Sequence, residues 1–126
     1  MKESFISRAK ENLAVAEATF AAGQYNACAN RAYYAAFHAA IEALKHYGFV
    51  PVIDHKRVQA DFSQYLVHRR KIFPSALKSY LSELMLVRSD ADYKREVSRK
   101  DASVQLKKAQ EFVSAILKAI EHDTHH

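Results

Sequence analysis

The sequence predicts an all-α fold, an antiparallel bundle of four to five helices. Apolar residues recur at steps of three and four along most of the 126 residues, as one buried face of an α-helix requires. Only two glycines and two prolines interrupt this pattern: Gly23, Gly48, Pro51 and Pro74. Because the connections between the expected helices are short, neighbouring helices should reverse direction.

The first two helices are expected over residues 4–22 and 25–47. The apolar stripe of the first consists of Phe5, Ala9, Leu13, Ala16 and Phe20. Gly23 suits the left-handed position that ends a helix, and Gly48 closes the second helix. Around an apolar face, small alanines cover most of the second helix, which is typical of a helix surrounded by others. We therefore expect residues 25–47 to form the central helix.

Three further helices are expected after Gly48. Asp54 can cap the third, which should end near Arg70. Pro74 fits the first turn of the fourth, whose buried stripe consists of Leu77, Tyr80, Leu81, Leu84 and Val87. The polar run 88–100 interrupts that stripe and reads as a loop. Ser98, followed by Asp101, resembles a capping box for the last helix, which should reach about Glu121.

One domain, residues 1–121, accounts for the chain, and residues 122–126 are expected to form a disordered, His-rich tail. The length is sufficient for a hydrophobic core without metals or disulfides. Cys28, the single cysteine, lies among alanines and is expected to be inert. No apolar run approaches the roughly 20 residues of a membrane span, and no signal peptide begins the chain, so we expect a cytoplasmic protein.

Motifs for cofactors and common catalytic chemistry are missing from the sequence. Two isolated glycines cannot form a phosphate-binding loop, no Cys and His residues have zinc spacing, and no serine lies in a recognised nucleophile motif. We therefore expect no cofactor and no metal site. The histidines of the terminal tail receive no role.

Positive charge is concentrated in one part of the chain. Residues 55–100 hold eleven Lys and Arg against five Asp and Glu, whereas the rest of the chain is nearly balanced. The expected basic surface consists of Lys56, Arg57, Arg69, Arg70 and Lys71. Such a surface could contact the phosphates of a nucleic acid, which gives sequence-independent affinity. The alternative is a solvated basic face, since acidic residues are interspersed.

The segment 30–40, Asn-Arg-Ala-Tyr-Tyr-Ala-Ala-Phe-His-Ala-Ala, carries the strongest functional signal. Arg31 and His38 are seven positions apart, nearly two helical turns, so they project from the same face with Tyr34 between them. A lone cation on an alanine-rich helix is costly to bury unless it is paired or hydrogen-bonded. Either Arg31 pairs with a carboxylate and His38 is a satisfied core histidine, or the two form part of a site.

Segment 30–40 resembles the signature of the second helix of the HEPN domain, a nucleotide-binding helical bundle of higher eukaryotes and prokaryotes. Other matching segments follow in the family's order and cover nearly the whole chain: the junction 23–25, His55 with Val58 and Phe62, the segment 88–93 (Arg-Ser-Asp-Ala-Asp-Tyr), and the helix 109–116. The resemblance implies a small helical domain, often a homodimer, that works with nucleotides or RNA. Members commonly accompany a minimal nucleotidyltransferase as a toxin and antitoxin pair.

The resemblance also implies site residues. Many HEPN proteins are metal-independent ribonucleases that use an arginine with a histidine four to six residues further on, and Arg31 and His38, with six residues between them, satisfy the outer spacing. In such chemistry the ribose 2′-hydroxyl attacks the adjacent phosphate, His38 acts as general acid or base, and Arg31 stabilises the additional charge. Residues expected to contact a ligand or support this pair are Asn30, Tyr34, Arg88, Asp92 and Tyr93. We rank nucleotide or RNA binding with a nucleotidyltransferase partner first, catalysis second, and a purely structural dimerisation module third.

Overall fold

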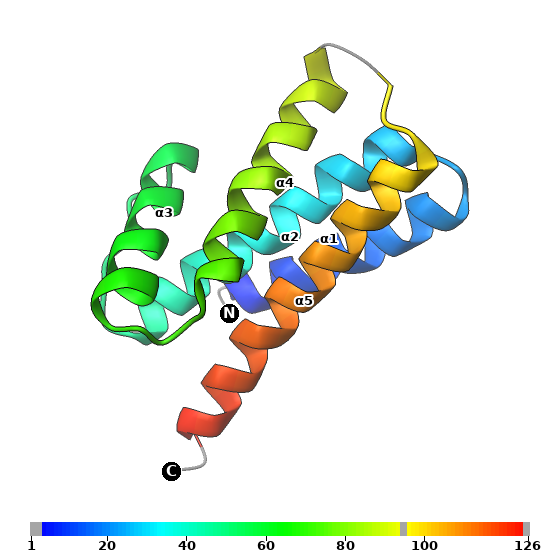
Figure 1. Ribbon diagram of the computed structural model, residues 1–126. Coiled ribbons are helices and arrows are strands. Elements are labelled where there is room, and N and C mark those ends of the chain that lie inside the picture. Colours follow the sequence, from blue (N-terminus) through cyan, green and yellow to red (C-terminus); the bar gives the residue numbers. More distant parts are fainter. Residues whose placement is uncertain (1–3, 94–95, 125–126) are drawn as a thin grey trace.

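The computed structural model describes residues 4–93 and 96–124, and this part of the chain is helical without strands (Figure 1). Its elements are α1 (Phe5–Ala21), α2 (Tyr25–His46), α3 (His55–Asp61), the π-helical segment η1 (Phe62–Arg69), α4 (Ser75–Tyr93) and α5 (Arg99–Thr124). Figure 1 shows α1, α2, α4 and α5 packed together, with α3 standing beside α4. The predicted all-α bundle is confirmed.

The central element of the bundle is α2, as its composition predicts. It contacts each of the other helical elements. Its buried residues include Tyr33, Phe37 and Leu44 together with a series of alanines that lie fully inside. Small side chains let several helices approach one axis closely, because packing density must be kept without large side chains colliding. Polar residues on α2 are therefore conspicuous, and they define the site described below.

Both glycines end helices in the way the sequence predicts. Gly23 and Gly48 have φ values of 77° and 93°, in the left-handed region that other residues rarely adopt. The amide of Gly48 donates to the carbonyl of Lys45, and that of Phe49 donates to Leu44, at 3.1 and 2.9 Å. This pair of bonds is the Schellman arrangement, and it reverses the chain after α2.

Short polar side chains start the helices. Ser4 accepts from the amide of Ser7, Asp54 from that of Arg57, and Ser98 from that of Asp101, each at 3.0 Å. The capping roles predicted for Asp54 and Ser98 are thus confirmed. The third predicted helix is divided in two, however, because the chain widens from α3 into the π-helical η1 at Phe62. Together α3 and η1 form an arm that packs mainly on α2 and α4. It also reaches α5 through Phe62, whose ring centre lies 5.2 Å from that of Phe112.

Two predicted boundaries were wrong. The polar run expected to be a loop is helical as far as Tyr93, because α4 continues beyond Val87, the last residue of its apolar stripe. Its polar side chains have partners there: Arg88 and Asp92, one turn apart, form an ion pair. The last helix also continues past Glu121 to Thr124, and Asp123 accepts a hydrogen bond from His46 of α2 at 3.1 Å.

Candidate functional site

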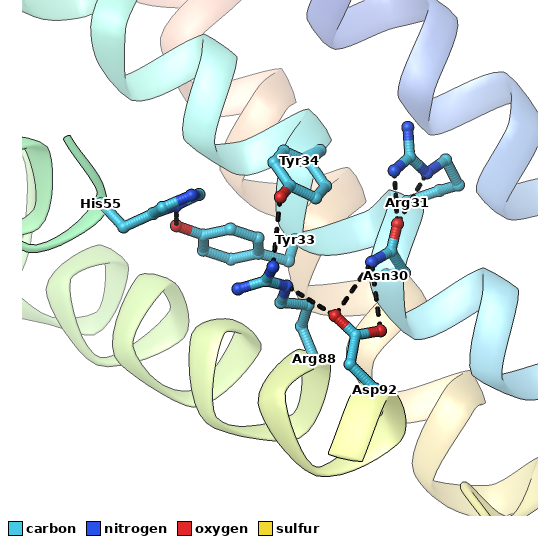
Figure 2. Close-up of polar contacts among 7 residues, drawn as sticks. All are labelled: Asn30, Arg31, Tyr33, Tyr34, His55, Arg88 and Asp92. Atoms are coloured by element: carbon cyan, nitrogen blue, oxygen red, sulfur yellow. Dashed lines mark hydrogen bonds and ion pairs between the residues drawn. The ribbon is translucent and has the colours of Figure 1, made fainter. Parts of the chain in front are cut away.

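Polar side chains of α1, α2 and α4 meet beside the middle of α2. We call this group the polar cluster, and it consists of Asn12, Asn30, Arg31, Tyr34, His38, Arg88 and Asp92. Figure 2 shows five of these residues: Asn30, Arg31, Tyr34, Arg88 and Asp92. On α2, Asn30, Arg31, Tyr34 and His38 are all half-buried, so the cluster lies at the edge of the core.

Neutral amide oxygens hold the guanidinium of Arg31. Its Nε donates to Oδ1 of Asn30 at 2.9 Å, Nη2 donates to the same oxygen, and Nη1 donates to Oδ1 of Asn12 at 2.9 Å. Its Cζ also lies 4.9 Å from the centre of the Tyr34 ring. Within the described side chains, no carboxylate oxygen comes within 4 Å of this guanidinium. Arg31 is thus hydrogen-bonded, while its charge is not neutralised by an acid.

Asn12 of α1 connects Arg31 to His38. While its carbonyl oxygen accepts from Arg31, its Nδ2 lies 3.3 Å from Nδ1 of His38 and 2.9 Å from the carbonyl of Arg8. With the amide in this orientation, Nδ1 of His38 must accept the hydrogen bond, which leaves the proton of a neutral imidazole on Nε2. His38 also stacks on Phe5, with ring centres 6.0 Å apart. The sequence analysis missed Asn12, although this polar residue adjoins the apolar stripe of the first helix.

Arg88 and Asp92 bring α4 into the cluster (Figure 2). Nη2 of Arg88 donates to the hydroxyl of Tyr34 at 3.2 Å, and its Cζ lies 5.4 Å from that ring. Nε of Arg88 is 3.1 Å from Oδ2 of Asp92, an ion pair in which the N–H is not aligned for a hydrogen bond. Both oxygens of Asp92 also accept from Nδ2 of Asn30, at 3.4 and 3.5 Å. Asp92 therefore neutralises Arg88 and ties α4 to α2.

Tyr33 and His55 form a second connection next to the cluster. The hydroxyl of Tyr33 and Nδ1 of His55 are 2.6 Å apart, as Figure 2 shows, and the His55 ring packs on Phe37 at 4.7 Å. Burial raises the pKa of Tyr33 well above its usual range, although the charge of Arg88 acts in the opposite direction. Tyr33 is therefore a neutral donor at physiological pH. The ring of Tyr34 lies 5.8 Å from that of His55, so His55 borders the polar cluster.

Charge in the polar cluster does not balance. Two guanidinium groups, those of Arg31 and Arg88, lie against one tyrosine ring, and Asp92 is the one carboxylate among the described side chains that accompanies them. Like charges at this separation repel, and the half-buried setting reduces screening by water. The arrangement leaves a net positive charge, which favours an anionic ligand.

The five residues of the expected basic surface lie in two groups, one at each end of the arm. Lys56 and Arg57 begin α3, whereas Arg69, Arg70 and Lys71 lie at the far end of η1. Arg57 pairs with Asp61 at 3.2 Å, and Arg70 donates to the carbonyl of Tyr47 at 2.9 Å, at the end of α2. Arg69 packs on the ring of Tyr65. All five side chains are exposed, and Lys56 and Lys71 each lie at the edge of a hollow.

Tyr93, the remaining predicted site residue, ends α4, and its side chain lies outside the described residues. Among the described residues, no three His, Cys, Asp or Glu side chains are arranged so that they could hold a metal ion. None of the described helices has the length and apolarity needed to cross a membrane.

Comparison with protein families decides the relationship of the chain. The model of the HEPN domain matches residues 2–120, nearly the whole chain. The chain belongs to the HEPN domain family. This membership supports a nucleotide- or RNA-binding helical domain at the level of the family, and it confirms the relationship that segment 30–40 predicts. A search of curated proteins gives no match.

Proposed function

We propose that this HEPN domain binds a phosphate-bearing nucleotide unit, free or within RNA, at the polar cluster. The observation that carries the proposal is the guanidinium of Arg31, held by two amide oxygens and lacking a carboxylate partner among the described side chains. A phosphate would supply the missing negative charge through charge-assisted hydrogen bonds. Arg88 and the Tyr34 hydroxyl lie within the same cluster and would add to this recognition.

Substitution of Arg31 tests the proposal directly. Arg31→Gln retains hydrogen-bonding groups but removes the charge, so the affinity for a short RNA such as a uridine dinucleotide should fall at least tenfold. Lys118→Gln, which removes one exposed charge from α5, is the matched control. Both variants are compared with the wild type by titration calorimetry after circular dichroism has established that they are folded. Equal affinity of Arg31→Gln and the control would contradict the proposal.

A second candidate function is metal-independent cleavage of RNA by Arg31 and His38. The supporting observation is Asn12, whose single amide holds both side chains. In the tautomer favoured by this contact, Nε2 of His38 carries a proton and can hydrogen-bond to a phosphate oxygen, whereas donation of a proton to the leaving 5′-oxygen requires the imidazolium form. Arg31 would stabilise the charge that develops on the phosphate.

Cleavage of labelled RNA in the presence of a chelator tests this second function. The wild type should cleave, and His38→Ala should lose at least a hundredfold of the rate while its melting temperature changes little. Loss of cleavage in the chelator, or equal cleavage by His38→Ala, would exclude this chemistry. If neither protein cleaves but both bind, nucleotide binding without turnover remains the function.

Partner proteins form the last part of the proposal. We propose a homodimer that works in the cytoplasm with a minimal nucleotidyltransferase, as a toxin and antitoxin pair. Exposed large apolar side chains that could contact a partner are Val15, Val50, Val52, Ile53, Leu86 and Val104. Light scattering of the purified protein tests dimerisation, and co-purification with the product of the adjacent gene tests the pairing. A purely structural module remains the alternative if Arg31→Gln and His38→Ala change only stability.

A further inference from the structure

The space between the arm and α4 forms a groove outside the polar cluster. Its volume is about 440 Å³, and its lining consists of Lys56, Gln59, Ala60, Ser63, Lys78, Ser82 and Met85. The two walls run antiparallel, and Nε2 of Gln59 donates to Oγ of Ser82 across the groove at 2.6 Å. A second hollow of about 520 Å³, lined in part by His68, Lys71 and Ser75, follows toward the loop before α4.

The two hollows adjoin, separated by a contact between Lys78 and His68, and together they define a path along the arm. Lys78, which lines the first hollow, has its Nζ 3.3 Å from Nε2 of His68, which lines the second. Lys56 and His68 are twelve positions apart, roughly 18 Å at the rise of an α-helix. The path is therefore long enough for several units of an extended polymer.

Charge along this groove has one sign. Lys56, Lys71 and Lys78 supply cations, three serines supply hydroxyl donors, and the described lining residues of both hollows include no carboxylate. The nearby acids are already engaged, because Asp61 pairs with Arg57 and Glu83 pairs with Lys108. Lysines and hydroxyl groups spaced along a groove fit a chain of phosphates, while the apolar surface of Ala60 and Met85 suits the faces of bases.

One end of the groove meets the polar cluster. Lys56 directly follows His55, and Met85 precedes Arg88 by one turn of α4. His55 and Arg88 both lie against the ring of Tyr34, at 5.8 and 5.4 Å. A strand with one nucleotide in the polar cluster could therefore continue into the groove.

We propose that the groove between the arm and α4 is a binding site for the phosphodiester backbone of single-stranded RNA that extends from the polar cluster. This inference rests on the proposed nucleotide binding at Arg31 and specifies its ligand as an extended strand. Lys56 and Lys78 contact phosphates, and the hydroxyl groups of Ser63 and Ser82 donate to them. The polar cluster alone holds a short ligand, whereas the groove adds affinity that increases with strand length.

The test compares uridine oligonucleotides of two and ten residues, measured by fluorescence anisotropy at several salt concentrations. The wild type should bind the ten-residue strand more tightly than the dinucleotide. The double variant with Lys56→Gln and Lys78→Gln should bind the ten-residue strand with an affinity lower on the order of tenfold at 0.1 M salt. The slope of log K against log salt concentration should also become about 1.4 less steep, since each phosphate contact to a single strand contributes about 0.7. Dinucleotide affinity should not change in this variant.

Matched controls separate the groove from general charge. Lys107→Gln with Lys118→Gln removes the same charge from exposed positions on α5 and should bind like the wild type. Lys56→Arg with Lys78→Arg should retain binding. Equal binding of the ten-residue strand by the groove variant and the α5 variant would overturn the inference, as would its displacement by inorganic phosphate at constant ionic strength.

Failure of the underlying proposal gives a different result. If Arg31→Gln weakens neither oligonucleotide, the polar cluster is not the nucleotide site, whatever the groove variant does. If Arg31→Gln lowers the affinity for both oligonucleotides and the groove variant lowers neither affinity, binding at the polar cluster is supported and the groove assignment is wrong. Absence of binding by the wild type would overturn both.

Discussion

At the residue scale, Asn12 organises the polar cluster because an amide can donate and accept at once. Its oxygen accepts from Arg31, and its nitrogen faces His38. An aspartate at this position would accept equally well from Arg31 but would also neutralise it. Asparagine thus fixes the guanidinium in place and leaves its charge available to a ligand.

Two substitutions of Asn12 should separate position from charge. Asn12→Ala leaves Arg31 charged but less firmly held, so we expect roughly a threefold loss of affinity for the uridine dinucleotide, less than the 1.4 kcal/mol of a tenfold change. Asn12→Asp should lose at least tenfold of the affinity for the dinucleotide, because the new carboxylate neutralises Arg31. The same ion pair should keep the melting temperature of Asn12→Asp at or above that of Asn12→Ala. Calorimetric titration and thermal unfolding measure both quantities. Tighter binding by Asn12→Asp than by Asn12→Ala would contradict the role of the unneutralised charge.

The sequence predicted only part of the composition of the polar cluster. Helical spacing placed Arg31, Tyr34 and His38 on one face, and the structure brings them together with Arg88 and Asp92. Whether they bind or react with a ligand stays a prediction. Contacts between residues far apart in the sequence, such as that of Asn12 with His38, depend on how two helices cross, which the pattern of one helix does not specify.

At the element scale, the arm is the least supported part of the bundle. It packs mainly on α2 and α4, reaches α5 through Phe62 only, and begins with α3, which has only seven residues. A short helix gains little from its own hydrogen bonds, so its first turn depends on the cap that Asp54 provides. Its change to a π-helix at Phe62 was not predicted, because the choice between helix types arises from tertiary packing and leaves no clear mark on the apolar spacing.

Removal of the α3 cap should destabilise the arm selectively. Asp54→Ala leaves the amide of Arg57 without its acceptor and should cost about 1 kcal/mol, whereas Asp54→Ser should retain most of the stability because serine can also cap. Hydrogen exchange should accelerate in residues 55–69 and change little in α2. Uniform acceleration through the bundle would show that the arm does not open by itself.

The extension of α4 through Arg88 and Asp92 illustrates where sequence patterns fail for a whole element. The residues after Val87 lack an apolar stripe, so the pattern predicted a loop. They remain helical because their partners are polar: Tyr34 and Asn30 of α2 accept from and donate to them. Apolar spacing predicted the other helix boundaries. It does not indicate a helix whose buried face consists of hydrogen-bonded polar side chains.

At the scale of the whole molecule, buried groups make stability depend on alkaline pH. Burial raises the pKa of the Cys28 thiol from 9.0 to about 11, and burial also raises the pKa of Tyr47 to about 12. Between pH 9 and 11, the unfolded chain loses the thiol proton while the folded protein retains it. The folded state therefore binds more protons, and its stability decreases as the pH rises.

Replacement of Cys28 should flatten this alkaline decrease. The wild type should lose on the order of 2 kcal/mol between pH 9 and 11 through this thiol, at 1.36 kcal/mol per pKa unit, and Cys28→Ala should not show that part of the loss. Urea unfolding at a series of fixed pH values measures the free energy of unfolding. Because the substitution itself changes packing, the two proteins are compared by how steeply this free energy falls with pH. Identical slopes for the two proteins would exclude a contribution from Cys28.

Most of the whole-molecule architecture was predictable, because two glycines, a few caps and the apolar spacing suffice to delimit the helices of a bundle. Whether the basic residues of the arm contact phosphates stays a prediction, and charge counted along the chain does not reveal local partners such as Asp61 for Arg57 or the carbonyl of Tyr47 for Arg70.

The attachment of the arm has a mechanical consequence. It joins the bundle through the segment after Gly48 and the short connection before α4, and Phe62 of η1 packs on Phe112 of α5 with ring centres 5.2 Å apart. A change in the separation between the arm and α4 would therefore disturb the fully buried side chains of Val58, Phe62 and Leu66. The width of the groove is thus set by the packing of the core, and a substitution that shortens Phe62 should alter both stability and groove width.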